Sequence, residues 1–230
     1  MNAVERGAAW LEPSTCVGSS QGIEADHPRI RAVAAELTGS APSAVEKARV
    51  LFEYVRDRWK YSYRVRLRGP EDISARVMLD RDDGFCIQKA ALLAALARAA
   101  GVPTALCFQT IRDRTLPRER IEEFFPEGLM VGHGLVAFHL GGRWVRQDPT
   151  HDRRTAERLG CDVVEFSPER DQLLPERSRS GHPLIEIVDD HGLYAQVCDW
   201  AIAHCLTWPW QTKFEDWCAL IREVASGRPA

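Results

Sequence analysis

The sequence has no apolar run that approaches the roughly 20 residues needed to span a bilayer. Its first residues, MNAVERGAAWLEPSTC, also lack the basic stretch followed by an apolar stretch that marks a secretory signal. An excess of charge of one sign is missing too, because 30 Lys and Arg residues stand against 33 Asp and Glu residues, for a net charge of -3. We therefore expect a cytoplasmic protein with no overall affinity for nucleic acid or membranes.

Paired cysteines are also missing. The seven cysteines are an odd number without a Cys-x-x-Cys pair, and a chain of 230 residues can bury a full core without disulfides. We expect reduced thiols, most of them core residues, at Cys16, Cys86, Cys107, Cys161, Cys198, Cys205 and Cys218.

No histidine or cysteine group has the spacing of a metal site. His133 and His139 would be about 20 Å apart on one strand, so a single ion could not bind both. Cys198, His204 and Cys205 do not have the ligand spacing of a zinc site. We expect neither a metal nor a cofactor.

Residues 26–61 have the pattern of two helices. Gly39 suits the end of the first, and Ser43 and Glu46 have the spacing of a capping box at the start of the second. Apolar residues then recur every three or four positions, which predicts one buried face, made of Val45, Ala48, Leu51, Val55 and Trp59. The segment predicts a helical layer that has no chemistry of its own.

The stretch YSYRVRLRG, residues 61–69, alternates apolar and basic side chains with the period of a half-buried strand. Arg64, Arg66 and Arg68 would share one face. That face could bind a substrate carboxylate or phosphate, or it could simply be a solvated strand surface.

Further elements follow along the chain. We expect strands at 104–111 and 184–188, a hairpin over 131–150 around Gly141-Gly142, and helices near 193–206 and 213–225. The charged stretch 151–183 is loop-rich, and its part from 167 to 183 could be a lid, a partner surface or a plain connection. Because the tail is too short for a second domain of ordinary size, residues 1–230 are expected to form one domain.

The stretch DDGFCIQKAALLAALARAAGVP, residues 82–103, predicts a buried, alanine-rich helix that begins near Cys86 and ends near Gly101. Cys86 could be a small apolar core residue. It could also be a nucleophile, because unpaired backbone N–H groups and the helix dipole favour a thiolate at a helix start. The stretch alone does not decide between these interpretations.

The hairpin predicts a partner for such a nucleophile. If Gly141 and Gly142 form a two-residue loop, paired residue numbers sum to 283, and His133 and Asp148 share one face, with Cβ atoms within about 7 to 8 Å. A loop with an odd number of residues would turn Asp148 to the other face. A carboxylate that orients an imidazole is the supporting half of nucleophilic catalysis, and Cys86 would supply the rest.

The stretch DGFCIQKAALLAALARAAGVPTAL, followed by GHGLVAFHLGGRWVRQDPT, resembles the core of the transglutaminase-like superfamily in its bacterial branch. That family has a G-x-C-x-x-K-A helix start, a helix ending in A-x-G-[IV]-P, a histidine strand, a tight turn, a tryptophan strand and an Asp-Pro. The resemblance covers about residues 40–160 and leaves 161–230 as a C-terminal extension. The matching residues are Gly84, Cys86, Lys89, Ala90, Gly101, Pro103, His133, Trp144, Asp148 and Pro149.

This resemblance implies an α+β, papain-like fold in which the helix that carries the cysteine packs on an antiparallel sheet. It also implies Cys86 as nucleophile, His133 as general base and acid, and Asp148 as the residue that orients His133. The sequence departs from the H-x-W-x-E pattern of many members, since Gly134-Leu135-Val136-Ala137 follows His133. Substrate preference therefore stays open.

Supporting residues are less well indicated. The backbone N–H of Cys86 is one candidate oxyanion donor, and Gln88 and Gln109 are the nearby amides that could supply a second. Lys89 could support the thiolate, although a surface role or a pairing with Asp83 is the preferred interpretation. Trp144 should face the same side as His133, where it would pack on the sheet or contact substrate.

The implied reaction is acyl transfer through a Cys86 thioester, from an amide, ester or thioester to water or to an amine. The partner would be a peptide, a protein or a small acyl or amine substrate. The alternative is a binding module that keeps the fold without catalysis. Such members often lose one of the three residues, whereas all three are present here.

Overall fold

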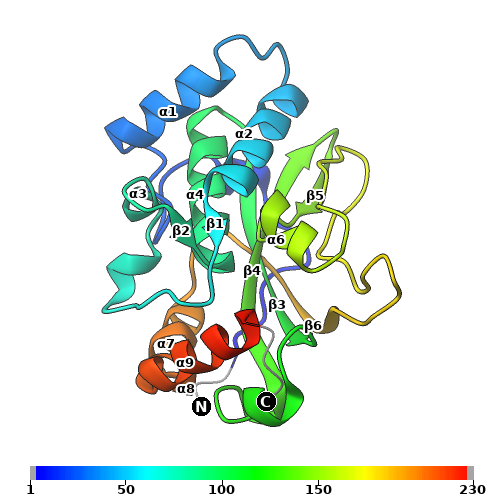
Figure 1. Cartoon of the computed structure of the whole chain (residues 1–230). Helices are drawn as coiled ribbons and strands as arrows, with labels where there is room; N and C mark the ends of the chain where they lie inside the picture. The colour runs from blue at the N-terminus through cyan, green and yellow to red at the C-terminus, as the bar shows by residue number, and fades with distance from the viewer. Residues whose placement is uncertain (1–3, 227–230) are drawn as a thin grey trace.

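The computed structural model describes residues 4–226. Helices pack on a curled, four-stranded antiparallel sheet with the strand order β5-β4-β3-β6 (Figure 1). The expected α+β architecture is therefore confirmed. The strands are β3 (Thr104–Asp113), β4 (Leu129–Leu140), β5 (Arg143–Gln147) and β6 (Ile185–Tyr194).

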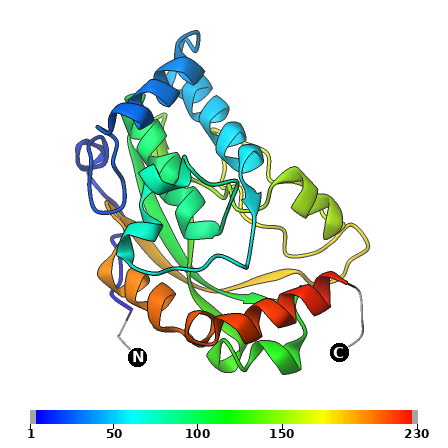
Figure 2. The same cartoon turned by 60° about the vertical axis from the view of Figure 1, so that its left-hand side comes forward.

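The helical layer forms where the sequence predicts it. Helix α1 spans Pro28–Thr38 and α2 spans Ala44–Arg58, and the Ser43 side chain accepts a hydrogen bond from the Glu46 backbone N–H at 3.2 Å. This is the predicted cap of α2. Both helices contact α4 (Cys86–Ala99), which also lies against β4 (Figure 2). Because α4 is covered from both sides, every residue from Ile87 to Arg98 is buried.

The β4–β5 hairpin has the predicted register. Leu140 pairs with Arg143 and Val136 with Gln147, so paired numbers sum to 283. Gly141 and Gly142 both have positive φ, at 57° and 82°, as a two-residue turn that matches the twist of the strands requires. The register from which we predicted that His133 and Asp148 share one face is therefore correct.

The predicted strand at 61–69 is wrong as a strand. Only Lys60–Tyr61 (β1) pairs, in parallel, with Asp83–Gly84 (β2). The burial of residues 64–68 still alternates as predicted, with all three arginines exposed. Side chains of the C-terminal helices replace the missing neighbouring strand: Gln211 bonds the Leu67 N–H and the Val65 carbonyl, at 2.9 and 2.7 Å.

The C-terminal part differs from its predicted bounds. Strand β6 continues to Tyr194, so the helix expected from 193 starts only at Asp199. Three helices then pack on the same core as α4, namely α7 (Asp199–Thr207), α8 (Pro209–Thr212) and α9 (Phe214–Ala225). Short elements complete the chain: η1 (Pro13–Cys16), η2 (Pro70–Ile73), α3 (Ala75–Met78), α5 (Arg118–Ile121), η3 (Pro126–Gly128) and α6 (Arg153–Arg158).

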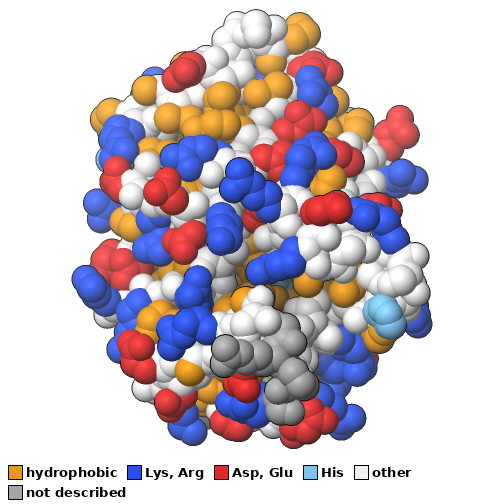
Figure 3. All heavy atoms as spheres, in the orientation of Figure 1, with side chains coloured by type: hydrophobic (Ala, Val, Ile, Leu, Met, Phe, Trp, Pro, Cys, Tyr) orange, Lys and Arg blue, Asp and Glu red, His pale blue; other side chains and the backbone are white. Residues whose placement is uncertain are grey.

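The surface carries both signs of charge. Basic and acidic side chains are interspersed over the face seen in Figure 3. Within residues 4–226, no helix is both long enough and apolar enough to cross a membrane.

Candidate active site

Cys86 is the first residue of helix α4, as predicted. The preceding residue, Phe85, has an extended backbone, and the Gln88 side chain accepts a hydrogen bond from the Phe85 N–H at 3.3 Å. Cys86 is partly exposed, whereas the rest of the helix to Arg98 is buried. The thiol therefore lies at the positive end of the helix dipole, where a reactant can reach it.

His133 and Asp148 are joined by the hydrogen bond that the hairpin register predicts. His133 Nε2 and Asp148 Oδ2 are 2.7 Å apart, and both side chains are buried, at 4% and 1% exposed. Asp148 Oδ1 accepts a second bond from the Thr150 N–H at 2.9 Å. Because Nε2 is engaged with the carboxylate, Nδ1 is the ring nitrogen that remains available to another partner.

Electrostatics favour a charged pair at these two residues. Burial by itself lowers the pKa of His133, but Asp148 and the neighbouring Cys86 outweigh it and raise that pKa to about 10. Burial likewise raises the pKa of Asp148, but His133 and Thr150 more than compensate, so the pKa is lowered. Each group thus favours the charged form of the other.

Two glycines bring the helix and the hairpin together. Gly132, with a φ of 90°, lies at a register shift opposite Gln109 and Thr110, just before His133. Such a bulge redirects the side chain beside it. At Gly134, an added Cβ would lie 2.9 Å from Ile87 Cα, so the start of α4 contacts β4 one residue away from His133.

A small cavity of about 70 Å³ opens beside Cys86 and His133. Sequence reasoning missed most of its walls, which come from the segment before α4, from β4 and from the C-terminal helices. A signal was present, since four of the seven tryptophans lie between residues 200 and 217. The cavity is lined by Tyr61, Tyr63, Phe85, Cys86, Ile111, Phe125, Met130, Val131, Gly132, His133, His204, Cys205, Trp208, Trp210 and Trp217.

The family comparison agrees with this geometry. The model of the transglutaminase-like superfamily core matches residues 31–149, just over half of the chain. The chain belongs to this superfamily. Cys86, His133 and Asp148 all lie inside the matched segment, and α7–α9 lie outside it. No curated protein matches the chain.

Solved structures related to this superfamily member are distant. A candidate cysteine protease from Cytophaga hutchinsonii is 18% identical, with a TM-score of 0.47 over 61% of this chain and 43% of that one. The periplasmic domain of TgpA from Pseudomonas aeruginosa is 21% identical, with a TM-score of 0.43 over 61% of this chain and 48% of that one. A candidate protease from Parabacteroides distasonis is 13% identical, with a TM-score of 0.38 over 55% of this chain and 24% of that one. The chain thus spans less than half the length of each.

Lys89, the lysine of the superfamily motif, is neither on the surface nor paired with Asp83. Its Nζ is buried and donates to the carbonyls of Arg56, Trp59 and Thr150, at 2.8, 2.9 and 2.9 Å. Burial lowers the pKa of Lys89 to about 7, against the opposing effect of nearby carboxylates. Asp83 instead pairs with Arg81. Lys89 joins the end of α2, α4 and the residues after Asp148, so its role is to hold the site together.

The two candidate amides do not line the cavity. Gln88 is fully buried, and besides capping α4 it donates from Nε2 to the Asp72 carbonyl at 2.5 Å. Gln109 pairs with His133 across the sheet, and its Nε2 lies 3.4 Å from Asp190 Oδ2. Both amides thus have other partners, and the Cys86 N–H stays the candidate oxyanion donor at the helix start.

Trp144, Arg64 and Arg66 also lie outside the cavity lining. Trp144 packs against the small cluster of Leu135 and Ala137, and its Nε1 donates to the Leu11 carbonyl at 3.0 Å. Leu135 and Ala137 lie two and four residues beyond His133 on β4, so Trp144 packs on the strand side that the predicted register gives it. Of the two roles left open for Trp144, packing on the sheet is the one observed. Arg64 is exposed, and the Arg66 guanidinium stacks 4.9 Å from the Phe214 ring centre.

Within residues 4–226, no group of three or more His, Cys, Asp or Glu side chains is arranged to hold a metal ion.

Proposed function

We propose that this protein is a thiol-dependent acyl-transfer enzyme with Cys86 as nucleophile, His133 as general acid and base, and Asp148 as the residue that orients His133. The observation that carries the proposal is the arrangement at one cavity. A partly exposed cysteine at a helix start lies beside a histidine whose far nitrogen is bonded to a buried carboxylate, at 2.7 Å. This is the three-part arrangement that activates a nucleophile.

The chemistry follows from these positions. The Cys86 thiolate attacks the carbonyl carbon of an amide, ester or thioester, and the oxyanion forms near the Cys86 N–H at the start of α4. His133 donates its Nδ1 proton to the leaving nitrogen, oxygen or sulfur as the bond to carbon breaks. Water or an amine then attacks the thioester, gives a proton back to His133 and releases the Cys86 thiolate.

Asp148 supports both steps without exchanging a proton. Its bond to Nε2 fixes the imidazole so that Nδ1 is directed to the thiol, and its negative charge balances the imidazolium. Because the pKa of His133 is raised to about 10, the acid form is present at neutral pH, before the leaving group needs its proton.

The acceptor decides between a hydrolase or peptidase and a transamidase or amide synthase. We propose a peptide, a protein or a small acyl or amine compound as substrate, and the cytoplasm as the place of action. The test is to offer water and a primary amine together as acceptors and to identify the products by mass spectrometry. A free acid would indicate a hydrolase or peptidase, and an amide would indicate a transamidase or amide synthase.

The first test is the pH dependence of cysteine alkylation by iodoacetamide, mapped residue by residue. Cys198 is a matched internal control, because it is also partly exposed but burial raises its pKa to about 12. We expect Cys86 to be labelled at pH 6 well ahead of Cys198, because the imidazolium stabilises the thiolate. His133→Ala should remove that preference.

Labelling of Cys86 at pH 6 no faster than that of Cys198, in folded protein, would contradict the proposal. A Cys86→Ala protein that keeps full biological effect would instead support a binding module that retains the fold.

A further inference from the structure

We propose that the acyl group transferred by Cys86 is short, uncharged and apolar, and that it binds in the cavity that residues 204–217 close over the cysteine. This inference rests on the proposed function and names the substrate class of the same site. We call this space the aromatic pocket, defined by Tyr61, Phe85, Phe125, Trp208, Trp210 and Trp217 together with Cys86 and His133.

The chemistry of the walls selects against charge. No Lys, Arg, Asp or Glu lines the aromatic pocket. Two polar side chains of the cavity lining already have partners within the protein: the Tyr63 hydroxyl donates to Asp113, and His204 Nδ1 bonds the Trp200 carbonyl at 2.8 Å. His133 is paired with Asp148, whose carboxylate lies 2.7 Å from Nε2. A carboxylate or ammonium on the acyl group would lose its water and find no counter-ion.

The size of the aromatic pocket selects against large groups. Its volume of about 70 Å³ is less than half of the roughly 150 Å³ of an engineered apolar cavity that binds benzene. A chain of a few carbon atoms fits, whereas an aromatic ring or a long chain would require the tryptophans to move. The aromatic pocket is therefore matched to a short aliphatic acyl group.

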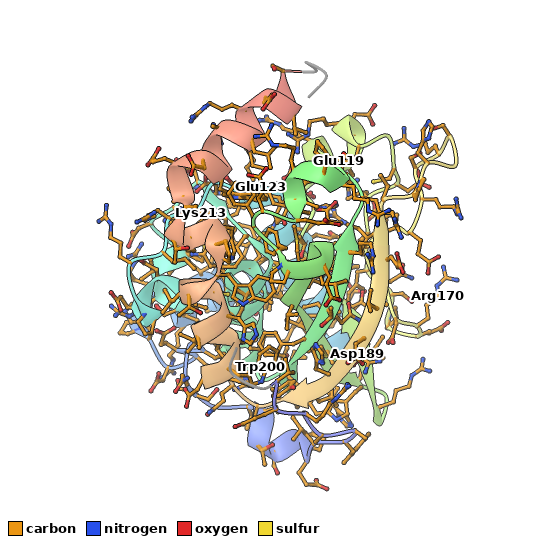
Figure 4. All side chains as sticks on the ribbon, turned by 90° about the horizontal axis from the view of Figure 1, so that it is seen from below. Glu119, Glu123, Arg170, Asp189, Trp200 and Lys213 are labelled. Atoms are coloured by element: carbon orange, nitrogen blue, oxygen red, sulfur yellow. The ribbon has the colours of Figure 1, made fainter. Side chains whose placement is uncertain are left out.

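The walls that set this limit belong to the C-terminal helices. Trp210 packs edge-on against Phe85 at 5.5 Å between ring centres, and Trp208 against Phe125 at 5.4 Å. Figure 4 shows this layer from outside, with Trp200 at its α7 end beside the sheet and Lys213 between α8 and α9. Because α7–α9 lie outside the segment that matches the superfamily core, the acyl preference is a property of this chain's own extension.

Phe85 connects the wall to the chemistry. It precedes Cys86 directly and is 7% exposed, so the Trp210 ring that packs on it lies one residue from the nucleophile. An acyl chain attached to the Cys86 sulfur would therefore meet the Trp210 side of the aromatic pocket within its first few carbon atoms. Replacing Trp210 with a smaller residue should allow a longer acyl chain to bind.

The test compares kcat/KM for p-nitrophenyl acetate, butyrate, octanoate and hemisuccinate, with Cys86→Ala as the background. Butyrate and hemisuccinate form the decisive pair, because both acyl chains have four carbons and only one ends in a carboxylate. We expect butyrate to exceed hemisuccinate by about a hundredfold, the factor that a few kcal/mol of uncompensated desolvation produces. Butyrate should also exceed octanoate.

Trp210→Leu should raise octanoate relative to butyrate by about tenfold, within the range known for a resized apolar pocket. Trp10→Ala is the control, since Trp10 is half exposed and packs on Trp144 and His139, away from the aromatic pocket. It should leave the chain-length preference unchanged. If Trp210→Leu does not fold, the preference of the parent protein for butyrate over hemisuccinate still tests the proposal.

Intact-mass detection of the Cys86 adduct separates the two levels of failure. An adduct with equal rates for butyrate and hemisuccinate would overturn the acyl class and leave the acyl-transfer function standing. The absence of an adduct with every ester would overturn both.

Discussion

Gly134 shows how one missing side chain permits the site to form. A Cβ at this position would lie 2.9 Å from Ile87 Cα and 3.3 Å from Ile87 N, which are backbone atoms of the helix that carries Cys86. Such atoms cannot rotate away as the end of a side chain can. The apolar run after His133, which departs from the pattern of many superfamily members, therefore has a local reason at its first residue.

Gly134→Ala should displace the start of α4 from β4. We expect a loss of about 1 to 3 kcal/mol in the free energy of unfolding, the usual cost of overpacking, and slower labelling of Cys86 at pH 6. Gly18→Ala is the matched control, because a Cβ there would have no atom within 4 Å. Equal effects of the two substitutions would argue against the steric account.

The raised pKa of His133 links stability to pH. The pKa of His133 is raised from 6.5 to about 10, so its contribution to stability is complete below pH 6.5 and is lost as the pH rises through 10. The stability advantage of the parent over His133→Gln should therefore shrink across this window, by an amount on the order of a few kcal/mol.

Urea unfolding at half-unit pH steps would measure this difference. Asp148→Asn removes the largest of the effects that raise the pKa, so the trend should weaken in that variant. A parent-minus-variant difference that stays constant from pH 6 to 10 would refute the assignment.

At the scale of elements, residues 61–69 show that alternation predicts burial better than it predicts strand pairing. Val65 and Leu67 are buried as the period of two indicates, but no strand lies beside them. Gln211 supplies one donor and one acceptor in place of a strand, and Trp217 Nε1 donates to the Tyr63 carbonyl at 2.6 Å. The extended segment thus depends on helices far along the chain. Leu67 and Gln211, for example, are 144 residues apart in sequence.

Gln211→Met keeps the length of the side chain and removes both hydrogen bonds. We expect a destabilisation of about 1 to 3 kcal/mol, because buried backbone groups lose their partners. Hydrogen exchange at the Leu67 amide should accelerate more than exchange in β3. Gln196→Met, at an exposed position, should change neither quantity. Unchanged protection of Leu67 in Gln211→Met would mean that the bond to Gln211 is dispensable.

At the scale of the whole molecule, buried cations join segments that are distant in sequence. Arg98, at the end of α4, is 3% exposed. Its guanidinium donates to the carbonyls of Thr104, Gly18 and Ala195, at 2.8, 2.9 and 2.8 Å. One side chain thereby connects the N-terminal segment, the start of β3 and the residue after β6. Lys89 does the same at the other end of α4.

Arg98→Met should cost about 3 kcal/mol or more, since three buried carbonyls lose their donor. The urea midpoint should fall while the slope of the transition is kept, because one cooperative core is weakened as a unit. Arg31→Met, on the exposed surface of α1, is the matched control and should have little effect. A changed slope in Arg98→Met would show instead that the N-terminal segment separates from the core.

Local patterns in the sequence were sufficient for the elements that carry the candidate site. The Gly141-Gly142 turn and the alternation around it determined the hairpin register, and hence the hydrogen bond between His133 and Asp148. The alanine-rich pattern and the glycine stop determined α4 with Cys86 at its first position. Hydrogen bonds and hydrophobic faces of this kind form between residues that are near in sequence or related by one turn, so a short window contains all the information.

Only the tertiary structure decided which of these elements meet. The bulge at Gly132, the contact of Gly134 with α4 and the burial of Lys89 depend on segments that no local period relates to one another. The same holds for the aromatic pocket, whose walls come from α7–α9 and from residues up to 156 positions earlier in the chain, as Tyr61 and Trp217 show. Long-range packing selects one arrangement among many that share the same local patterns, which is why the sequence predicted the parts of the site and the fold brought them together.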